Sequence, residues 1–293
     1  MPEILNLKFF TRTLSFTILA LIAFAANSVL CRAALRDALI DPATFTSIRL
    51  ISGSIILLLL VYISKSKNLS EAKGSWSSAG ILFIYAATFS FAYVSLDTGT
   101  GALIVFAMVQ ITMITSAMIH GKKMSLSEWA GVLLAFGGLV YLVFPGVTAP
   151  SLSGLILMIA SGMAWGLYSL KGKSSIDPLG DTAFNFLRTI PFVIILLLFS
   201  IDQVKAEPQG YTLAIISGAL TSGIGYTIWY MALKGLSAVQ ASIVQLIVPV
   251  IAAAGGILFL SEIISIRLIV ASVLILGGIA IVILKGRNER NTA

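Results

Sequence analysis

The chain has 293 residues, of which 58% are apolar and only 11% are charged, with a mean hydropathy of +1.02 and a formal net charge of +7. Soluble globular domains are about 45–50% apolar and about 25% charged, so the composition excludes an ordinary soluble domain. The single cysteine, Cys31, excludes a disulfide framework and a cysteine-based metal cluster.

Continuously apolar segments follow one another along the whole chain. About 20 residues, at a rise of 1.5 Å each, cross a hydrocarbon core of about 30 Å as a helix. Strands of a membrane barrel would instead alternate apolar and polar residues. We therefore predict an all-α integral membrane protein with ten spans, at residues 14–31, 44–63, 77–95, 100–119, 128–144, 152–170, 183–201, 211–233, 238–260 and 266–284.

The first span also resembles a cleavable signal peptide, because Lys8 and Arg12 precede an apolar run that contains Ala23-Phe24-Ala25. We expect it to be retained, because it has an internal counterpart in the second half of the chain. With the N-terminus in the cytoplasm, the cytoplasmic segments hold 13 of the 19 Lys and Arg residues and the outer segments hold 4. The positive-inside rule therefore predicts that both termini are cytoplasmic, and basic loops facing anionic lipid explain the net charge without a nucleic-acid partner.

The second span recurs in the seventh. Residues 184–199, FNFLRTIPFVIILLLF, match residues 45–60, FTSIRLISGSIILLLL, at eight of sixteen positions. Aliphatic matches carry little information in a membrane protein. The shared Phe-x-x-x-Arg is more specific, and it makes Arg49 and Arg188 equivalent positions.

Other pairs keep nearly the same offset, such as Gly137-Gly138 with Gly277-Gly278 at 140 residues. One repeat therefore comprises five spans. After an odd number of crossings, a second copy must enter the membrane in the opposite orientation, which is the inverted arrangement of many secondary transporters. We predict a first five-helix repeat over residues 1–148 and a second, inverted one over residues 149–293.

These features resemble the drug/metabolite transporter superfamily in its ten-helix form with two EamA-type repeats. Lys122 and Val109 stand where the repeat would place counterparts of Glu262 and Pro249, so the first half is the more diverged one. The resemblance is carried by the paired Phe-x-x-x-Arg motifs, the first-span motifs around Asn27 and Trp165, Ser237-Ala238, Ala241, Pro249, Glu262 and the paired glycines.

The resemblance implies a multi-pass protein of the bacterial inner membrane that exports amino acids, metabolites or drugs. Among the branches of the superfamily, the chain looks most like the exporters of aromatic amino acids and methyl viologen. We expect its partners to be a small-molecule substrate and the lipid bilayer, with no cofactor, no metal and no nucleic acid. Because the two halves share one chain, we expect a monomer.

Two interpretations of Arg49 and Arg188 stay open. Each lies about one and a half turns from the end of its span, so its guanidinium could reach the membrane interface and anchor the helix, or bond the carbonyls at a neighbouring helix end. Alternatively, the two form alternating latches, each bonding across the boundary between the repeats when its side of the membrane is closed. A latch needs the planar guanidinium fork, so substitution by Lys separates the two interpretations.

Aromatic and amide side chains occur near the middle of several spans. Trp and Tyr normally prefer the membrane interfaces, and an unsatisfied amide in hydrocarbon is costly. Their depth favours a central substrate cavity with a few hydrogen-bonding groups, although each could simply bond a neighbouring helix. Pro249 in the ninth span is either a hinge or a bend that packs well. The predicted cavity residues are Asn27, Tyr85, Gln110, Trp165, Tyr168, Trp229 and Gln245.

All twelve acidic residues fall in loops or at span ends, whereas proton relays and lipophilic-cation pumps use a carboxylate within the membrane. We therefore expect facilitated export of amino acids and related metabolites by alternating access. Proton-coupled export of drugs or metabolites, through Asp97 or Glu262 at the outer rim, is the alternative. A non-transporting scaffold also stays open. An intramembrane enzyme is disfavoured, because it needs convergent His, Asp, Ser or Lys groups at depth.

Overall fold

The computed structural model describes residues 2–64, 74–121, 125–144, 149–236 and 238–291. These residues form helices and connecting loops without a strand; one isolated antiparallel bridge joins Ile40 and Ala206. The helical elements are α1 (Pro2–Arg36), α2 (Pro42–Ser64), α3 (Trp76–Tyr93), α4 (Thr98–Ile119), α5 (Leu126–Val143), α6 (Leu152–Gly172), α7 (Pro178–Leu187), α8 (Ile190–Phe199), η1 (Ile201–Gln203), α9 (Pro208–Ile216), η2 (Ser217–Ile224), α10 (Gly225–Leu233), α11 (Ala238–Gln245), α12 (Val248–Leu260) and α13 (Ile266–Asn291).

The prediction of an all-helical protein with several membrane-crossing helices is confirmed. Among the described residues, seven helices are long and apolar enough to cross a membrane, and two shorter apolar helices cover Glu128–Leu142 and Ile266–Ile281. Side-chain caps begin several helices, because the first backbone N–H groups of a helix have no partner within it. Ser125 and Glu128 form a reciprocal capping box at α5, and the Ser151 hydroxyl accepts from the backbone N–H of Gly154 at α6.

Two of the predicted spans are broken next to a proline. The ninth is divided between α11 and α12, with Pro249 as the second residue of α12, and its role as a hinge or as a packing bend stays a prediction. The seventh is divided in the same way between α7 and α8, with Pro191 as the second residue of α8. Proline cannot donate to the carbonyl four residues earlier, which releases the carbonyls of Gln245 and Leu187 from the helical pattern.

The eighth span contains a π-helical segment, η2, between α9 and α10. Its wider turn is rare in proteins and occurs mostly as short insertions, frequently at functional sites. The sequence analysis did not anticipate it. This segment packs against α2 and α1 through five buried residues, while Leu220 on its other side is exposed.

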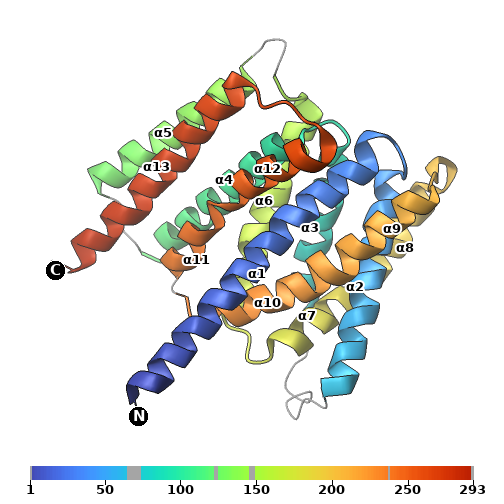
Figure 1. Cartoon of the computed structure of the whole chain (residues 1–293), viewed down its shortest axis with the longest axis horizontal. Helices are drawn as coiled ribbons and strands as arrows, with labels where there is room; N and C mark the ends of the chain where they lie inside the picture. Colours follow the sequence, from blue (N-terminus) through green and yellow to red (C-terminus); the bar gives the residue numbers. More distant parts are fainter. Residues whose placement is uncertain (1, 65–73, 122–124, 145–148, 237, 292–293) are drawn as a thin grey trace.

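The helices form one bundle in which distant parts of the chain lie side by side (Figure 1). α5 and α13 pair along one flank of the bundle. α6 packs against α3 and α4, whereas α1 packs against α10 and α12. Both chain ends lie at the end of the bundle opposite the loop that joins α1 to α2 (Figure 1). Segments from the two predicted repeats therefore alternate around a shared core.

Two loops at the end of the bundle away from the chain termini are joined to each other. The backbone N–H of Asp41 donates to the carbonyl of Lys205 at 2.8 Å, and the Asp41 carboxylate accepts from the Lys205 N–H at 3.0 Å. The N–H of Glu207 donates to the carbonyl of Leu39 at 2.7 Å. This pairing lies immediately before the first residue of α2 and ties the start of α2 to the start of α9.

Candidate functional site

The side chain of Arg49 is enclosed within the bundle, with an exposed fraction of 0%. Its Nε donates to Ser222 Oγ at 2.8 Å, and its Nη2 donates to Tyr226 Oη at 2.6 Å and to Tyr85 Oη at 3.4 Å. The guanidinium also lies 5.3 Å from the ring centroid of Tyr85 and 5.2 Å from that of Phe89, within the range of cation–π attraction. All four partners are formally neutral.

Because its side chain is fully enclosed by protein, the latch interpretation fits Arg49 better than the anchor interpretation does. Distance from the helix end alone predicts a place near the membrane surface, but the hydrogen bonds of this guanidinium go to side chains inside the bundle. Ser222 and Tyr226 belong to the second predicted repeat, so two of the hydrogen bonds cross the boundary between repeats. This is the geometry that the latch hypothesis requires; the latch role itself stays a prediction.

Arg188, the equivalent arginine, has different surroundings. It caps the C-terminus of α7, where its Nη1 donates to the carbonyl of Phe184 at 3.3 Å in the same helix. Its guanidinium lies 5.9 Å from the ring centroid of Trp76 in α3 and 5.8 Å from that of Phe184. Arg188 is half-buried, so the anchor interpretation fits it better than it fits Arg49.

Asn27 is fixed by hydroxyl groups of η2. Its Oδ1 accepts from Ser217 Oγ at 2.6 Å, from Thr221 Oγ1 at 3.1 Å and from Ser222 Oγ at 3.4 Å. Because Ser222 also accepts from Arg49, one hydrogen-bonded chain runs from α2 through η2 to α1. Buried polar groups are costly unless paired, and here three elements satisfy one another.

Glycines allow α2 and η2 to approach closely enough for this chain to form. A Cβ placed on Gly218 would lie 2.7 Å from the Cα of Arg49, and a Cβ on Gly53 would lie 3.0 Å from the carbonyl oxygen of Gly218. Real Cβ atoms essentially never come as close as 2.7 Å, and 3.0 Å would require the neighbour to shift. The contact resembles the small-residue surfaces that bring membrane helices together.

The predicted aromatic residues form a connected group beside this polar chain. Trp165 Nε1 donates to Gln245 Oε1 at 3.2 Å, and the Trp165 ring centroid lies 4.9 Å from that of Tyr85 and 5.7 Å from that of Tyr168. The sequence analysis did not select Tyr226, whose ring centroid lies 4.5 Å from that of Trp165. These distances are typical of attractive aromatic pairs.

The other predicted cavity residues lie around the same core. Trp229 Nε1 donates to Ser169 Oγ at 3.3 Å. The ring centroid of Phe24 lies 5.5 Å from that of Trp229 and 5.1 Å from that of Trp165, so Phe24 packs between the two. Gln110 is fully buried in α4. All seven predicted cavity residues are between 0 and 6% exposed, so in this conformation they pack against protein. Their role as cavity walls stays a prediction.

A second polar cluster lies at the rim formed by the α3–α4 connection. Arg32 pairs with Asp97 at 3.1 Å and with Glu262 at 3.4 Å. Glu262 also accepts from the backbone N–H of Thr98 at 3.0 Å and from its hydroxyl at 3.0 Å. A carboxylate at this position compensates the positive end of the α4 dipole. The Glu262 side chain is 10% exposed, whereas that of Asp97 is 62% exposed.

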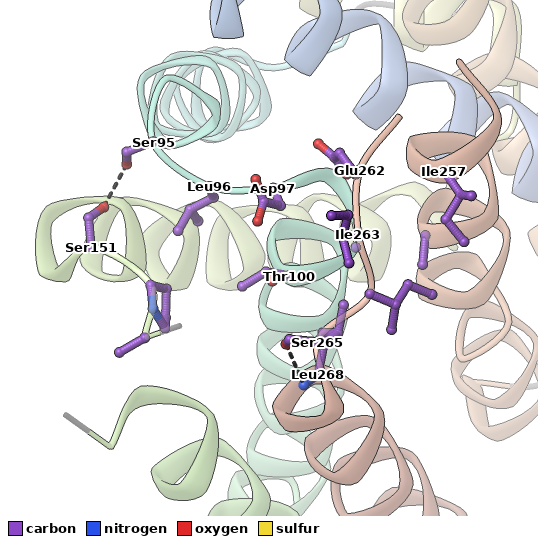
Figure 2. Close-up of a pocket in the computed structure, with 15 residues that line it drawn as sticks. Ser95, Leu96, Asp97, Thr100, Ser151, Ile257, Glu262, Ile263, Ser265 and Leu268 are labelled. Atoms are coloured by element: carbon purple, nitrogen blue, oxygen red, sulfur yellow. Dashed lines mark hydrogen bonds between the residues drawn. The ribbon is translucent and has the colours of Figure 1, made fainter. Parts of the chain in front are cut away.

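A pocket of about 380 Å³ opens beside this cluster, with Asp97, Glu262 and Thr100 along its wall (Figure 2). The Ser95 and Ser151 hydroxyls are 2.6 Å apart at its edge (Figure 2). A second pocket, of about 540 Å³ and mostly apolar, lies between α12 and α13. Neither pocket is lined by any of the seven predicted cavity residues.

A bundle of apolar helices around a polar and aromatic core, made by interleaved segments of two halves, defines a membrane transporter architecture. The EamA-like transporter family matches residues 11–144 and, a second time, residues 152–284. The chain belongs to this family. Membership supports a multi-pass membrane protein that transports rather than an enzyme.

Several relatives, two of them named transporters, and one solved structure are similar to this chain. A protein of Pseudomonas aeruginosa described as uncharacterised is 48% identical over 272 residues, which is 93% of this chain and 94% of that protein. The uncharacterised transporter YoaV of Bacillus subtilis is 24% identical, covering 82% of this chain and 86% of YoaV. An uncharacterised transporter of Clostridium kluyveri is also 24% identical, with 90% of each chain covered. A crystal structure with 18% identity has the same fold, with a TM-score of 0.66 over 94% of this chain and 97% of that chain.

Proposed function

We propose that the protein is a secondary transporter of the bacterial inner membrane, with both termini in the cytoplasm. It exports amino acids, aromatic ones among them, and related small metabolites by facilitated alternating access. The observation that carries the proposal is the buried chain from Arg49 through Ser222 to Asn27, because it joins the two predicted repeats by bonds that can break and re-form. A permanent scaffold has no need of a buried charge at that seam.

The proposal includes ten spans in two inverted repeats, over residues 1–148 and 149–293. Two separate family matches, over residues 11–144 and 152–284, support this division. The packing supports it as well. α3 and α4 contact α6, the first helix of the second repeat, and the corresponding elements α10 and α12 contact α1, the first helix of the first repeat. Exchanging conformations between such repeats opens a central site to either side in turn.

The substrate class follows from the aromatic group. Tyr85, Trp165 and Tyr226 present flat rings with polar tips, which suit planar or amphipathic solutes of amino-acid size. Facilitated transport is supported by the position of the acids. Glu262 is engaged in an ion pair and in helix capping at the rim rather than lying free at the centre. Proton-coupled export through Asp97 or Glu262 is the alternative.

The test is solute flux in liposomes that contain the purified protein. A panel of aromatic and aliphatic amino acids, purines and aromatic cations is measured with and without an imposed pH gradient, against protein-free liposomes. We expect aromatic amino acids to equilibrate faster than in the protein-free control and to stop at equal concentrations. Accumulation driven by a pH step would replace the facilitated mechanism with the proton-coupled one. Absence of flux for every solute would refute the transporter assignment and leave the scaffold.

A further inference from the structure

We propose that Arg49 binds the carboxylate of the transported solute, so that the substrates are small molecules carrying a carboxylate. This inference rests on the proposed function and names the group that recognises the substrate. It begins with a buried atom: Nη1 of Arg49 has no hydrogen-bond partner among the described residues, although the side chain is fully enclosed.

The charge of Arg49 is the first argument. A guanidinium stays protonated in proteins, so this side chain carries a full positive charge inside the bundle. The ion pairs of the described residues involve Arg32 and Arg36, and none involves Arg49. Its contacts are hydroxyls and aromatic rings. Buried charges are normally paired with an opposite charge. Among the described residues, no carboxylate forms an ion pair with Arg49.

The geometry of the guanidinium is the second argument. Nε is used by Ser222 and Nη2 by the two tyrosines, while both N–H groups of Nη1 lack an acceptor. Nη1 and Nη2 together form one edge of the planar fork, which matches the two oxygens of a carboxylate. The hydroxyls of Tyr85 and Tyr226 lie beside that edge, 3.0 Å from each other, where they can also donate to a bound carboxylate.

The surroundings give the third argument, because they explain discrimination. Tyr85 and Phe89 flank the guanidinium, and Trp165 extends the aromatic wall away from it. A solute with a carboxylate at one end and an apolar or aromatic body at the other matches both parts. An amide or alcohol of the same shape would leave Arg49 without a counter-charge, and sites with an unpaired buried polar group reject such analogues strongly.

The same side chain also links binding to the seam between the repeats. A carboxylate that engages Nη2 competes with Tyr226, which belongs to the second repeat, while Nε keeps its bond to Ser222. Substrate binding therefore exchanges one bond of the predicted latch for a bond to the solute. A solute without the carboxylate makes no such exchange.

The experiment compares three solutes that differ only in this group: L-phenylalanine, its amide and the corresponding alcohol, phenylalaninol. Flux of each is measured in liposomes containing wild-type protein, Arg49→Met, Arg49→Lys and the matched control Arg36→Met. Arg36 is an exposed arginine at the same end of the bundle. We expect wild type and Arg36→Met to move phenylalanine at least ten times faster than the amide or alcohol. Arg49→Met should reduce this ratio to near one, with Arg49→Lys in between.

Equal flux of the three solutes through wild type would overturn the inference while leaving the proposed function intact. An unchanged ratio in Arg49→Met would overturn it as well. Size-exclusion profiles and thermal melts establish that each variant is folded. If Arg49→Met does not fold, the wild-type ratio and Arg49→Lys decide, since a lysine that keeps the full wild-type ratio shows that the fork is not used. Absence of flux for every solute tested would instead refute the transporter assignment itself.

Discussion

The hydroxyl of Tyr226 should hold the bundle in the conformation seen here, and its removal by Tyr226→Phe should open it. In the closed state this hydroxyl accepts the shortest hydrogen bond of Arg49, at 2.6 Å, and donates to Tyr85 at 3.0 Å. A hydrogen bond to a charged group contributes about 1.5–3 kcal/mol. In an open state water can solvate the guanidinium, so removing the Tyr226 hydroxyl destabilises mainly the closed state. At about 1.4 kcal/mol per factor of ten, the open population should rise about 10- to 150-fold.

The chain supplies its own reporter of this opening. Cys31 is the only cysteine, and it is fully buried in α1. It lies four residues after Asn27, so the two occupy the same face of the helix. The rate of Cys31 labelling by a water-soluble maleimide, on protein in lipid nanodiscs, is then proportional to the open population. Tyr226→Phe should raise this rate by the same factor of about 10–150.

Two controls make the result specific. Cys31→Ser measures background labelling, and Tyr211→Phe removes the hydroxyl of a tyrosine that is 43% exposed in α9. An unchanged rate in Tyr226→Phe, or an equal increase in Tyr211→Phe, would show that the Arg49–Tyr226 bond does not hold the bundle closed.

Three further substitutions test separate contacts. Gly218→Ala should lower the thermal stability of the purified protein and the flux, because its Cβ would lie 2.7 Å from the Cα of Arg49, whereas Gly137→Ala, which meets nothing within 4 Å, should have little effect on either. Glu262→Gln should cost about 1.5–3 kcal/mol, seen as a lower midpoint of denaturation, because it weakens the charge-assisted hydrogen bonds with Arg32 and Thr98 at a side chain that is 10% exposed. Asp97→Asn, at a side chain that is 62% exposed, should cost about 0–1 kcal/mol, and equal losses would contradict the argument. Arg49→Lys should reduce flux at least tenfold, since one ammonium cannot reproduce the planar fork; full retention would refute the latch.

Sequence alone predicted those features that depend on local chemistry. Uninterrupted apolar runs identified the helices, and Pro249 marked a kink because proline removes a helical donor whatever surrounds it. The same signal was present at Pro191 and was not used. The π-helical turn of η2 gives no comparable signal, because its extra residue is stabilised by packing against α2 rather than by its own composition.

Parts of the candidate site depend on tertiary contacts that the sequence does not show. Depth along a helix can be read from distance to its end, but burial depends on what covers that end. For Arg49 the sequence left two interpretations open, because its partners Ser222 and Tyr226 lie 173 and 177 residues away and only the fold brings them together. Tyr226 was missed although Trp229 was selected, because nothing in the apolar stretch shows which of several aromatic residues faces the arginine.

The equivalence of Arg49 and Arg188 in the repeat does not extend to their partners, and this bears on how the two sides close. At an offset of 141 residues, Tyr226 corresponds to Tyr85, so both repeats supply a tyrosine. The position equivalent to Ser222 is Ile81, which has no hydroxyl to accept from Arg188. Arg49 therefore has a hydroxyl partner where the equivalent position for Arg188 is apolar, and the contacts of Arg188 include the Trp76 ring and a carbonyl of its own helix. Arg188→Lys should accordingly reduce flux less than Arg49→Lys does, and equal losses would show two matching latches instead.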